Sequence, residues 1–341
     1  MSLFCELPGA MMPLVSVVLP VHNGGRFLSC AVESILSQRH ENLELLLIDD
    51  HSTDSAIAEL DKSDTRLKVL TCRGRGVVNA FNAGFAHSKG EYVARMDADD
   101  ISLPGRFHTQ LDYLDRYPLI DIAGCCVDIF SETGIQGGLE RYQHWLNSVR
   151  EPEQVRQQIF IESPLPNPGL MFRRAALQQL GGYRDNQWPE DYDLLLRADA
   201  ANMQMGKPAP VLLRWREHES RLTHTDARYE RKRFMQAKAH FLVHHRLQKR
   251  SVVIWGAGPS GRLIFDLLTA EGAKVEGFIE VHPRRIGGQK RGLPVWPIEK
   301  TTRLGEALLL VAVGAAGARE EITAYLDAHG KLPGQDYLFV A

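Results

Sequence analysis

The chain has 341 residues, of which 44% are hydrophobic and 24% charged, and its formal net charge is −2 at pH 7. This length exceeds what one hydrophobic core usually holds, so we expect two domains. The near-neutral charge balance argues against nucleic acid as a partner, because binding to a phosphate backbone normally needs a basic surface. The five cysteines form neither a CxxC pair nor an even framework, which argues against disulfides and favours a reducing cytoplasm.

No apolar run approaches the roughly 18–20 residues that a membrane-spanning helix needs. The longest candidate, residues 307–316, is about half that length and contains Gly314. The first dozen residues lack the pattern of a signal peptide and are expected to form a tail. These features predict a soluble, cytoplasmic protein, or at most one that is peripheral at the inner face of the membrane.

The first hundred residues alternate between strand and helix patterns. These patterns occupy residues 15–19, 27–36, 43–48, 67–70, 77–87 and 91–96. The alternation predicts βαβ units, and therefore an α/β fold with a mostly parallel sheet. Several of the predicted strands end in polar or acidic residues, which would gather chemical groups at one edge of the sheet.

The next stretch is less regular. Helix, strand, strand and helix patterns are expected at residues 106–117, 122–130, 170–173 and 189–200, with a loop or lid over residues 134–168. Residues 228–250 carry eight Lys or Arg, three His and one acid, with apolar residues spaced along one helical face. Such a basic helix can bridge two domains as a solvated linker or lie on anionic lipid. We favour the linker and keep peripheral membrane contact as the alternative.

A glycine-rich loop marks the C-terminal segment. The surrounding pattern is strand, helix and strand, at residues 251–255, 262–270 and 274–279. Gly256, Gly258 and Gly261 would form a tight turn that phosphate can approach, and Glu280, about 20 residues on, could bind a ribose hydroxyl. The segment has only about 90 residues, too few for two complete mononucleotide halves. It is expected to bind one nucleotide or none.

Acidic residues recur at three places in the first 227 residues. They are Asp49-Asp50 after one predicted strand, Asp97-Ala98-Asp99-Asp100 after another, and Glu190-Asp191 at the start of a predicted helix. Asp97 and Asp99 are separated by one small residue, so their carboxylates can converge on one hard divalent cation that also holds phosphate oxygens. By itself, such a triplet is more often an acidic surface turn, because such triplets are frequent by chance. An ionised carboxylate at a helix start can accept a proton from an attacking hydroxyl, but it is also a common helix-start residue.

Four motifs follow one another along the chain. They are VSVVLPVHN at 15–23, IDDHSTD at 48–54, DADD at 97–100, and GGY at 181–183 leading to EDYDL at 190–194. Their order and separation resemble the inverting glycosyltransferases of family 2, which have the GT-A fold, a mostly parallel sheet with helices on both faces. The resemblance covers roughly residues 13–225. It departs from the family pattern at Asn167-Pro168, where His often precedes the Pro, and at His51, where Gly or Asn is common.

The resemblance implies a role for each matching residue on the nucleotide side. Pro20, His22 and Asn23 would line the nucleotide, and Asp50 would contact the base, most typically uracil. Asp97 would address ribose or metal-bound water.

The same resemblance places metal and catalytic roles further along the chain. Asp99, together with Asp97, would ligate Mn²⁺ or Mg²⁺ bridging the donor diphosphate. Asp191 would deprotonate the acceptor hydroxyl, with Glu190 beside it, and Arg221 or His224 would reach the diphosphate.

The C-terminal segment has a resemblance of its own. Residues 251–341 look like the small Rossmann-type domains that precede bacterial sugar acyltransferases, and this implies a pocket for a nucleotide sugar or another nucleotide. We therefore expect a GT-A domain over 13–227, a basic linker helix over 228–250 and a Rossmann-like domain over 251–341.

Taken together, these expectations describe a metal-dependent inverting glycosyltransferase of hexosyltransferase type. Its donor would be a nucleotide-diphospho sugar, UDP-linked, and its acceptor a saccharide or lipid-linked saccharide in bacterial surface polysaccharide or glycoconjugate synthesis. Two alternatives stay open. One is a NAD-dependent oxidoreductase acting through residues 256–261, and the other is a sensor that binds nucleotide sugars without catalysis.

Overall fold

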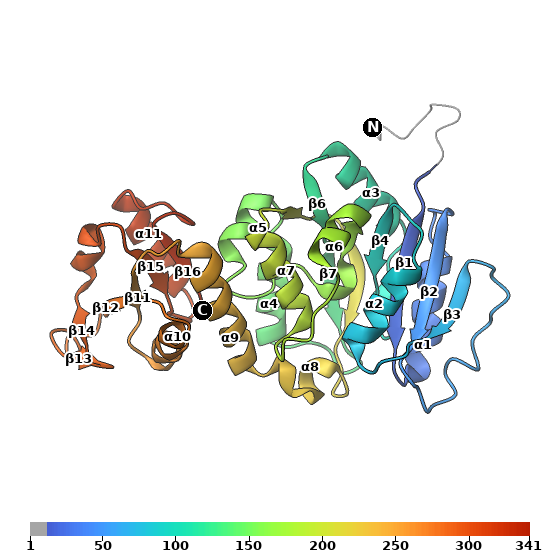
Figure 1. Ribbon diagram of the computed structural model, residues 1–341, viewed down its shortest axis with the longest axis horizontal. Coiled ribbons are helices and arrows are strands. Elements are labelled where there is room, and N and C mark those ends of the chain that lie inside the picture. Colours follow the sequence, from blue (N-terminus) through green and yellow to red (C-terminus); the bar gives the residue numbers. More distant parts are fainter. Residues whose placement is uncertain (1–11) are drawn as a thin grey trace. The chain divides into compact units, whose positions relative to one another are not determined.

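The computed structural model in Figure 1 describes residues 12–341. The contacts divide the chain into two units. Unit 1 runs through Pro152 and adds Pro164–Asn186 and Asp193–Thr225, whereas unit 2 holds Glu153–Ser163, Gln187–Tyr192 and Asp226–Ala341. The expected tail lies almost wholly outside the described residues. No helix within 12–341 is both long and apolar enough to cross a membrane.

The main sheet of unit 1 has seven strands in the order β3-β2-β1-β4-β8-β6-β9. Their bounds are β1 Val15–Val21, β2 Leu43–Asp49, β3 Leu67–Thr71, β4 Tyr92–Arg95, β6 Ile120–Ala123, β8 Met171–Arg173 and β9 Gln204–Gly206. All neighbouring strands are parallel except that β8 runs antiparallel to β4 and β6. The predicted α/β class with a mostly parallel sheet is confirmed.

Helices cover both faces of this sheet. The unit 1 helices are α1 Leu28–Leu36, α2 Val77–His87, α3 Arg106–Arg116, α4 Gly138–Ser148, α6 Arg174–Leu180 and α8 Leu222–Thr225, and α7 Glu190–Ala200 contributes most of its length. Apolar residues of α1 and α3 join one core with Val17 and Leu19 of β1. On the other face α2 lies so close to β1 that a Cβ at Gly84 would be 2.4 Å from a methyl of Val18. Because β1 is covered on both faces, its sequence is apolar throughout rather than alternating.

The predicted single strand over 122–130 is wrong. The chain instead forms β6 and then β7 Cys126–Phe130, which belongs to a second sheet with β5 Ile101–Ser102 and β10 Val211–Arg216. The two strands separate at Gly124, whose N–H donates to the carbonyl of Gly206. A Cβ on Gly124 would lie 2.8 Å from Leu165, so glycine allows this close passage.

The loop or lid predicted over 134–168 is also wrong. It contains α4, the helix α5 Pro152–Gln158 and the short turn η2 Asn167–Gly169. Polar residues that resemble a loop composition have structural roles here. Asn147 bonds the backbone N–H and C=O of Val127 at 2.9 and 2.8 Å, and Gln143 accepts from Ile129. The polar face of α4 therefore satisfies the edge of β7.

Unit 2 is built around a six-stranded sheet in the order β13-β14-β12-β11-β15-β16. The bounds are β11 Val252–Trp255, β12 Val275–Ile279, β13 Gln289–Lys290, β14 Leu293–Trp296, β15 Leu308–Val311 and β16 Tyr337–Phe339, with helices α10 Pro259–Ala270 and α11 Ala318–Ala328. Only the β13–β14 pair is antiparallel among the pairs of this sheet. The strand, glycine loop and helix expected after residue 250 are present.

The basic segment 228–250 is not one solvated helix. It forms η3 Ala227–Tyr229, α9 Arg231–Phe241 and a π-helical turn, η4 Leu242–Arg246. Met235 and Phe241 are buried, and the Lys238 ammonium is buried as well, donating to the carbonyl of Ile161 at 2.6 Å. Burial lowers the pKa of Lys238 to about 8. The expectation of a solvated helix fails because this helix packs as part of unit 2.

Candidate active site

The strand order of unit 1 gathers polar groups at one edge. β1 lies between β2 and β4, so the connections leave in opposite directions at this point, where open α/β sheets bind ligands beyond the carboxyl ends of their strands. The carboxyl ends of β1, β2 and β3 are followed directly by His22, Asp50 and Cys72, and Asp97 is the second residue after β4. The sheet therefore brings together residues that lie up to 75 positions apart in the sequence.

The ends of β1 and β2 are joined through Asp50. Its N–H donates to the carbonyl of Val21 at 2.7 Å, and its own carbonyl lies 2.7 Å from His22 Nδ1. The largely buried carboxylate accepts from the N–H of Gly76 at 2.7 Å, which fixes the loop after β3. Asp50 thus organises the edge where the sequence predicted a base-binding residue.

Asn23 holds the two neighbouring loops together. Its backbone has a positive φ of 54°, and its side-chain oxygen accepts from the N–H groups of Thr53 and Asp54 at 2.7 and 3.3 Å. Pro20 lies inside β1, one residue before the strand ends. Asn23 and Pro20 therefore shape the rim of the site, and the carboxylates are its reactive groups.

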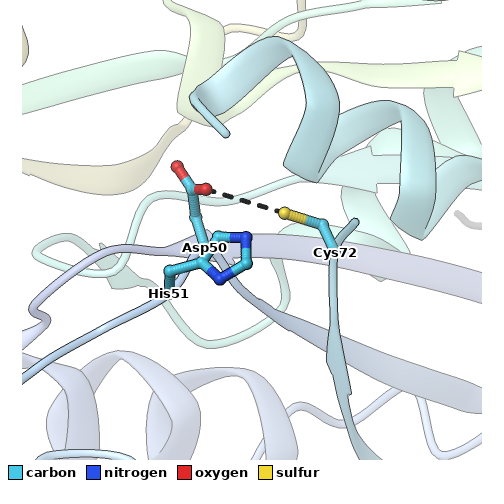
Figure 2. A group of neighbouring side chains, drawn as sticks. All are labelled: Asp50, His51 and Cys72. Carbon is cyan, nitrogen blue, oxygen red and sulfur yellow. Dashed lines mark hydrogen bonds between the residues drawn. The ribbon is translucent and has the colours of Figure 1, made fainter. Parts of the chain in front are cut away.

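Figure 2 shows Asp50 and His51 beside Cys72, a neighbour that the sequence motifs did not indicate. The Cys72 sulfur lies 3.6 Å from an Asp50 carboxylate oxygen and contacts the carbonyl of Gly74. His51 has a φ of 58°, and its Nε2 is buried without a hydrogen-bond partner among the described residues. Burial, reinforced by the charge of Asp50, raises the pKa of Cys72, so the thiol stays protonated near neutral pH.

The predicted carboxylate cluster is assembled at the end of β4. One oxygen from each of Asp97, Asp99 and Asp100 lies within 4.8 Å of the others. Asp97 pairs with Arg95 at 2.5 Å, yet burial, helped by Asp99, still raises the pKa of Asp97. Asp100 is only 1% exposed, and burial together with the charges of Asp99 and Asp97 raises its pKa well above the ordinary value.

The donor set fits a divalent cation. One oxygen of Asp100 accepts from the N–H of Arg216 at 2.7 Å, whereas its Oδ2 is buried with no hydrogen-bond partner in the described chain. A buried carboxylate oxygen without a donor, next to two further carboxylates, is costly unless a positive charge approaches. Oxygen ligands of this kind are those that Mg²⁺ and Mn²⁺ prefer. The residues that could hold the ion are therefore Asp97, Asp99 and Asp100.

Buried side chains hold the cluster from behind. Arg106 is fully buried and donates to the carbonyl of Arg95 at 2.8 Å. Its Nε donates to Gln110 at 3.1 Å, and Gln110 in turn donates to the carbonyls of Gly124 and Gly169. Burial lowers the pKa of Arg106, although such a group stays charged at neutral pH. This network fixes the last residues of β4 and so the direction of the carboxylates.

A basic segment after β10 faces the cluster. Arg216 Nε donates to the carbonyl of Asp99, and His218 Nε2 lies 2.7 Å from the Asp99 carboxylate. Arg221 and His224, which the sequence assigned to a diphosphate, both bind Glu217. Burial alone would lower the pKa of Arg221, but the charges of Asp100 and Asp99 raise it.

His218 was missed from the sequence because no motif surrounds it. Its position two residues beyond the strand β10 is the signal that could have indicated it. A cavity of about 350 Å³ opens beside it, lined by Ser131, Thr133, Gly134, Glu217, His218, Glu219 and His224. That volume is within the range of small-molecule sites.

Glu190 and Asp191 belong to unit 2 and differ in their surroundings. Glu190 is buried, and both of its carboxylate oxygens are 2.8 Å from the hydroxyl of Tyr229. Burial, with the nearby Glu190 charge, raises the pKa of Tyr229 well above its usual value. Asp191 is partly exposed, and its Oδ1 accepts from the N–H of Tyr192 at 2.7 Å. Of the two acids, Asp191 is the one that solvent can reach.

The three glycines of the unit 2 loop differ in how much room they leave for a side chain. Gly256 has a φ of 111°, and a Cβ on Gly261 would lie 1.8 Å from the carbonyl oxygen of Gly256, so neither position accepts a side chain easily. Nothing lies within 4 Å of a Cβ placed on Gly258, which leaves open space above the loop. Glu280 is paired with Arg285 at 2.9 Å and accepts from the N–H of Val281.

Comparison with known proteins bears on unit 1. Residues 16–181 match the model of the family described as Glycosyl transferase family 2. This stretch is therefore similar to family 2 glycosyltransferases. It contains β1 to β4 and so the Asp50 and Asp97–Asp100 positions.

Relatives and solved structures agree with this. The chain is 33% identical over 194 residues to EpsE of Bacillus subtilis, which is named as a glycosyltransferase, covering 54% of this chain and 66% of EpsE. It is 26% identical to the Escherichia coli O-antigen biosynthesis glycosyltransferase WbnJ, over 61% of this chain and 81% of WbnJ. Its fold is similar to the crystal structure of S. aureus TarS 1–349 in complex with UDP-GlcNAc, with a TM-score of 0.55, 17% identity, and coverage of 70% of this chain and 68% of TarS. The expected GT-A fold is confirmed, and the chain spans just under two thirds of the length of EpsE.

Proposed function

We propose that the chain transfers a sugar, with inversion, from a nucleotide-diphospho sugar, UDP-linked, to a hydroxyl of a saccharide or lipid-linked saccharide acceptor. The observation that carries the proposal is the carboxylate cluster Asp97, Asp99 and Asp100 at the switch-point edge of the sheet, facing the basic segment after β10. The printed names of relatives support the class of product, because WbnJ acts in O-antigen biosynthesis. TarS, which has the same fold, is seen with UDP-GlcNAc. Synthesis of a surface polysaccharide or glycoconjugate, in the cytoplasm or at the inner membrane face, fits this class.

The donor would bind along the strand ends. Asp50 would meet the base, with His22 and Asn23 shaping the rim and Pro20 behind them, and Asp97 would address the ribose or metal-bound water. Asp97 and Asp99 would hold Mn²⁺ or Mg²⁺. The ion would neutralise the charge that develops on the leaving nucleoside diphosphate.

The chain's own basic residues have separate tasks. His218 and Arg216 orient Asp99 through its carboxylate and its carbonyl. Arg221 keeps its positive charge near the carboxylates and is suited to bind a diphosphate. The half-exposed His224 is suited to the same role, and each residue would first have to release Glu217.

Asp191 would act as the base. Its carboxylate would accept the proton from the acceptor hydroxyl as that oxygen attacks the anomeric carbon, in one displacement that inverts the configuration. Glu190 is bound by Tyr229 through both oxygens, which makes it a positioning residue for the start of α7.

The test of this assignment compares Asp191→Asn with Glu190→Gln. Nucleoside diphosphate release from a panel of UDP-sugars is measured with a bacterial lipid-linked saccharide extract as acceptor. We expect Asp191→Asn to lower turnover by about 10³-fold while Mn²⁺-dependent UDP binding is unchanged, because only proton transfer is removed. Glu190→Gln keeps an acceptor for Tyr229 and should lower turnover far less. Wild-type turnover in Asp191→Asn would exclude Asp191 as the base.

The glycine loop of unit 2 supports a second candidate, a nucleotide site of its own. The open space above Gly258 and the close contact of Gly261 with Gly256 match what a phosphate-binding turn needs. Glu280, already paired with Arg285, would have to exchange that partner for a ribose hydroxyl. A nucleotide or nucleotide sugar held there would position or regulate unit 1, whereas NAD turnover would favour the oxidoreductase alternative.

A further inference from the structure

Two histidines and a glutamate of unit 2 converge on one another. His240 lies in the last turn of α9, His244 follows in the π-helical turn η4, and Glu271 directly follows α10. Glu271 Oε2 is 3.2 Å from His240 Nδ1 and 2.9 Å from His244 Nε2. The three donor atoms all lie within 4.8 Å of one another.

We propose that His240, His244 and Glu271 form a Zn²⁺ site. Two imidazoles and one carboxylate are a ligand set typical of zinc bound by three protein residues, with a water in the fourth position. Tetrahedral zinc with bonds of about 2.0–2.1 Å separates its ligand atoms by roughly 3.3 Å. The two nitrogen–oxygen distances here, 3.2 and 2.9 Å, require only small side-chain adjustments to reach that spacing.

The histidines are placed by elements that do not depend on the metal. Positions four apart on a helix lie on the same side, which brings the rings of His240 and His244 to 4.5 Å between centroids. The His240 ring also contacts Trp188 at 5.5 Å and the edge of Phe241 at 5.4 Å. The π-helical turn η4 directly follows α9, and π-helical turns are uncommon and often occur at functional sites. The backbone therefore presents both nitrogens toward one oxygen before any ion binds.

Without metal, each histidine can give a hydrogen bond to the same carboxylate oxygen. To bind Zn²⁺, each of these ring nitrogens must present its lone pair, so its proton moves to the other ring nitrogen by exchange with solvent and the ion takes the place between the three donor atoms. The side chains of His240, His244 and Glu271 are 37%, 47% and 33% exposed, so an ion can enter from solvent and a water can complete the coordination. The bound ion would fasten the π-helical turn to the end of α10 and stabilise unit 2.

The site differs in chemistry from the other clusters of the described chain. The Asp97–Asp100 cluster offers only carboxylate oxygens, which suit harder cations. Asp50, His51 and Cys72 offer a thiol, whose raised pKa opposes the thiolate that zinc requires. The experiment must therefore distinguish zinc binding at each of these three clusters.

The test titrates the EDTA-stripped full chain with Zn²⁺ alone, in competition with a chromophoric chelator at pH 7.5. We expect one site whose affinity falls by at least about 100-fold in His244→Gln and His240→Gln and by about 10- to 100-fold in Glu271→Gln. His329→Ala is the matched control, since it removes an exposed imidazole of unit 2 whose ring contacts Tyr325. That variant, Cys72→Ala and Asp99→Asn should all keep wild-type affinity for this site.

A second readout protects the conclusion against variants that misfold. Co²⁺ should give the visible absorption of a tetrahedral site in the wild type and in His329→Ala but not in His244→Gln, with circular dichroism of the metal-free variants unchanged. Glu271→Gln keeps an oxygen acceptor for the histidines, so its metal-free fold should be the least affected. Zinc affinity that is unchanged in all three site variants, or that disappears in Cys72→Ala instead, would overturn the proposal.

Discussion

The carboxylate cluster of unit 1 and the histidine cluster of unit 2 each present three ligands, yet their electrostatics are opposite. Burial raises the pKa values of Asp97 and Asp100, and Asp100 keeps a buried oxygen without a donor in the described chain. For Glu271, burial alone would raise the pKa, but hydrogen bonds from His244 and His240 lower it overall. In the first cluster Asp100 keeps an oxygen without a donor in the described chain, whereas the carboxylate of the second already receives two hydrogen bonds from histidines of its own unit. Activity should therefore depend strongly on the Mn²⁺ or Mg²⁺ of unit 1. The Zn²⁺ of unit 2 should mainly affect local stability.

The largest effect should come from Asp99→Asn. Loss of one carboxylate removes a metal ligand and the partner of His218, so we expect turnover to fall by about 10³-fold or more. Stability should not fall, because one of three repelling carboxylates becomes neutral. The matched control is Asp128→Asn in the same unit, an exposed aspartate paired with Arg214. Turnover by Asp99→Asn equal to that of Asp128→Asn would show that the carboxylate cluster is not used.

A pair of glycines in unit 2 should separate folding from binding. Gly261→Ala places a methyl 1.8 Å from the carbonyl oxygen of Gly256 and should lower the free energy of unfolding by about 3 kcal/mol. Gly258→Ala meets nothing within 4 Å and should leave the melting curve nearly unchanged, while blocking any nucleotide that approaches this loop. Thermal unfolding with and without nucleotides measures both effects. Equal destabilisation by the two substitutions would contradict the close contact between Gly256 and Gly261.

The smallest effect concerns two buried lysines, one in each unit. Burial lowers the pKa of Lys207 and of Lys238 to about 8. Between pH 8 and the usual pKa of a lysine ammonium, these lysines bind more protons in the unfolded chain than in the folded one. The free energy of unfolding should therefore rise with pH in this window, by roughly 2 kcal/mol between pH 8 and 10 relative to Lys207→Met or Lys238→Met. Urea unfolding at both pH values tests this, and a wild-type minus variant difference that does not change with pH would refute the burial of a charged lysine.

The sequence predicted best where one local pattern decides the outcome. The strands β1, β2 and β4 are short apolar runs, and the acids that follow them could be assigned to one edge because parallel strands place their ends together. The polar composition of helix α4 predicts a loop, because the partners of these polar residues lie on the edge of β7, about 20 residues away in the sequence. His218 meets Asp99 across 119 positions, and Glu271 meets His244 across 27. No spacing rule in a single sequence could reveal such pairs, because the fold alone brings them together.

Metal-dependent binding of UDP tests the central claim most directly. Thermal unfolding of the full chain is measured with UDP, with and without Mn²⁺, for the wild type, Asp99→Asn and His244→Gln. We expect UDP to raise the melting temperature only when Mn²⁺ is present, in the wild type and in His244→Gln, and not in Asp99→Asn. Stabilisation by UDP that needs no metal and survives Asp99→Asn, or stabilisation by NAD in its place, would contradict a metal-dependent nucleotide-sugar site at Asp97–Asp100.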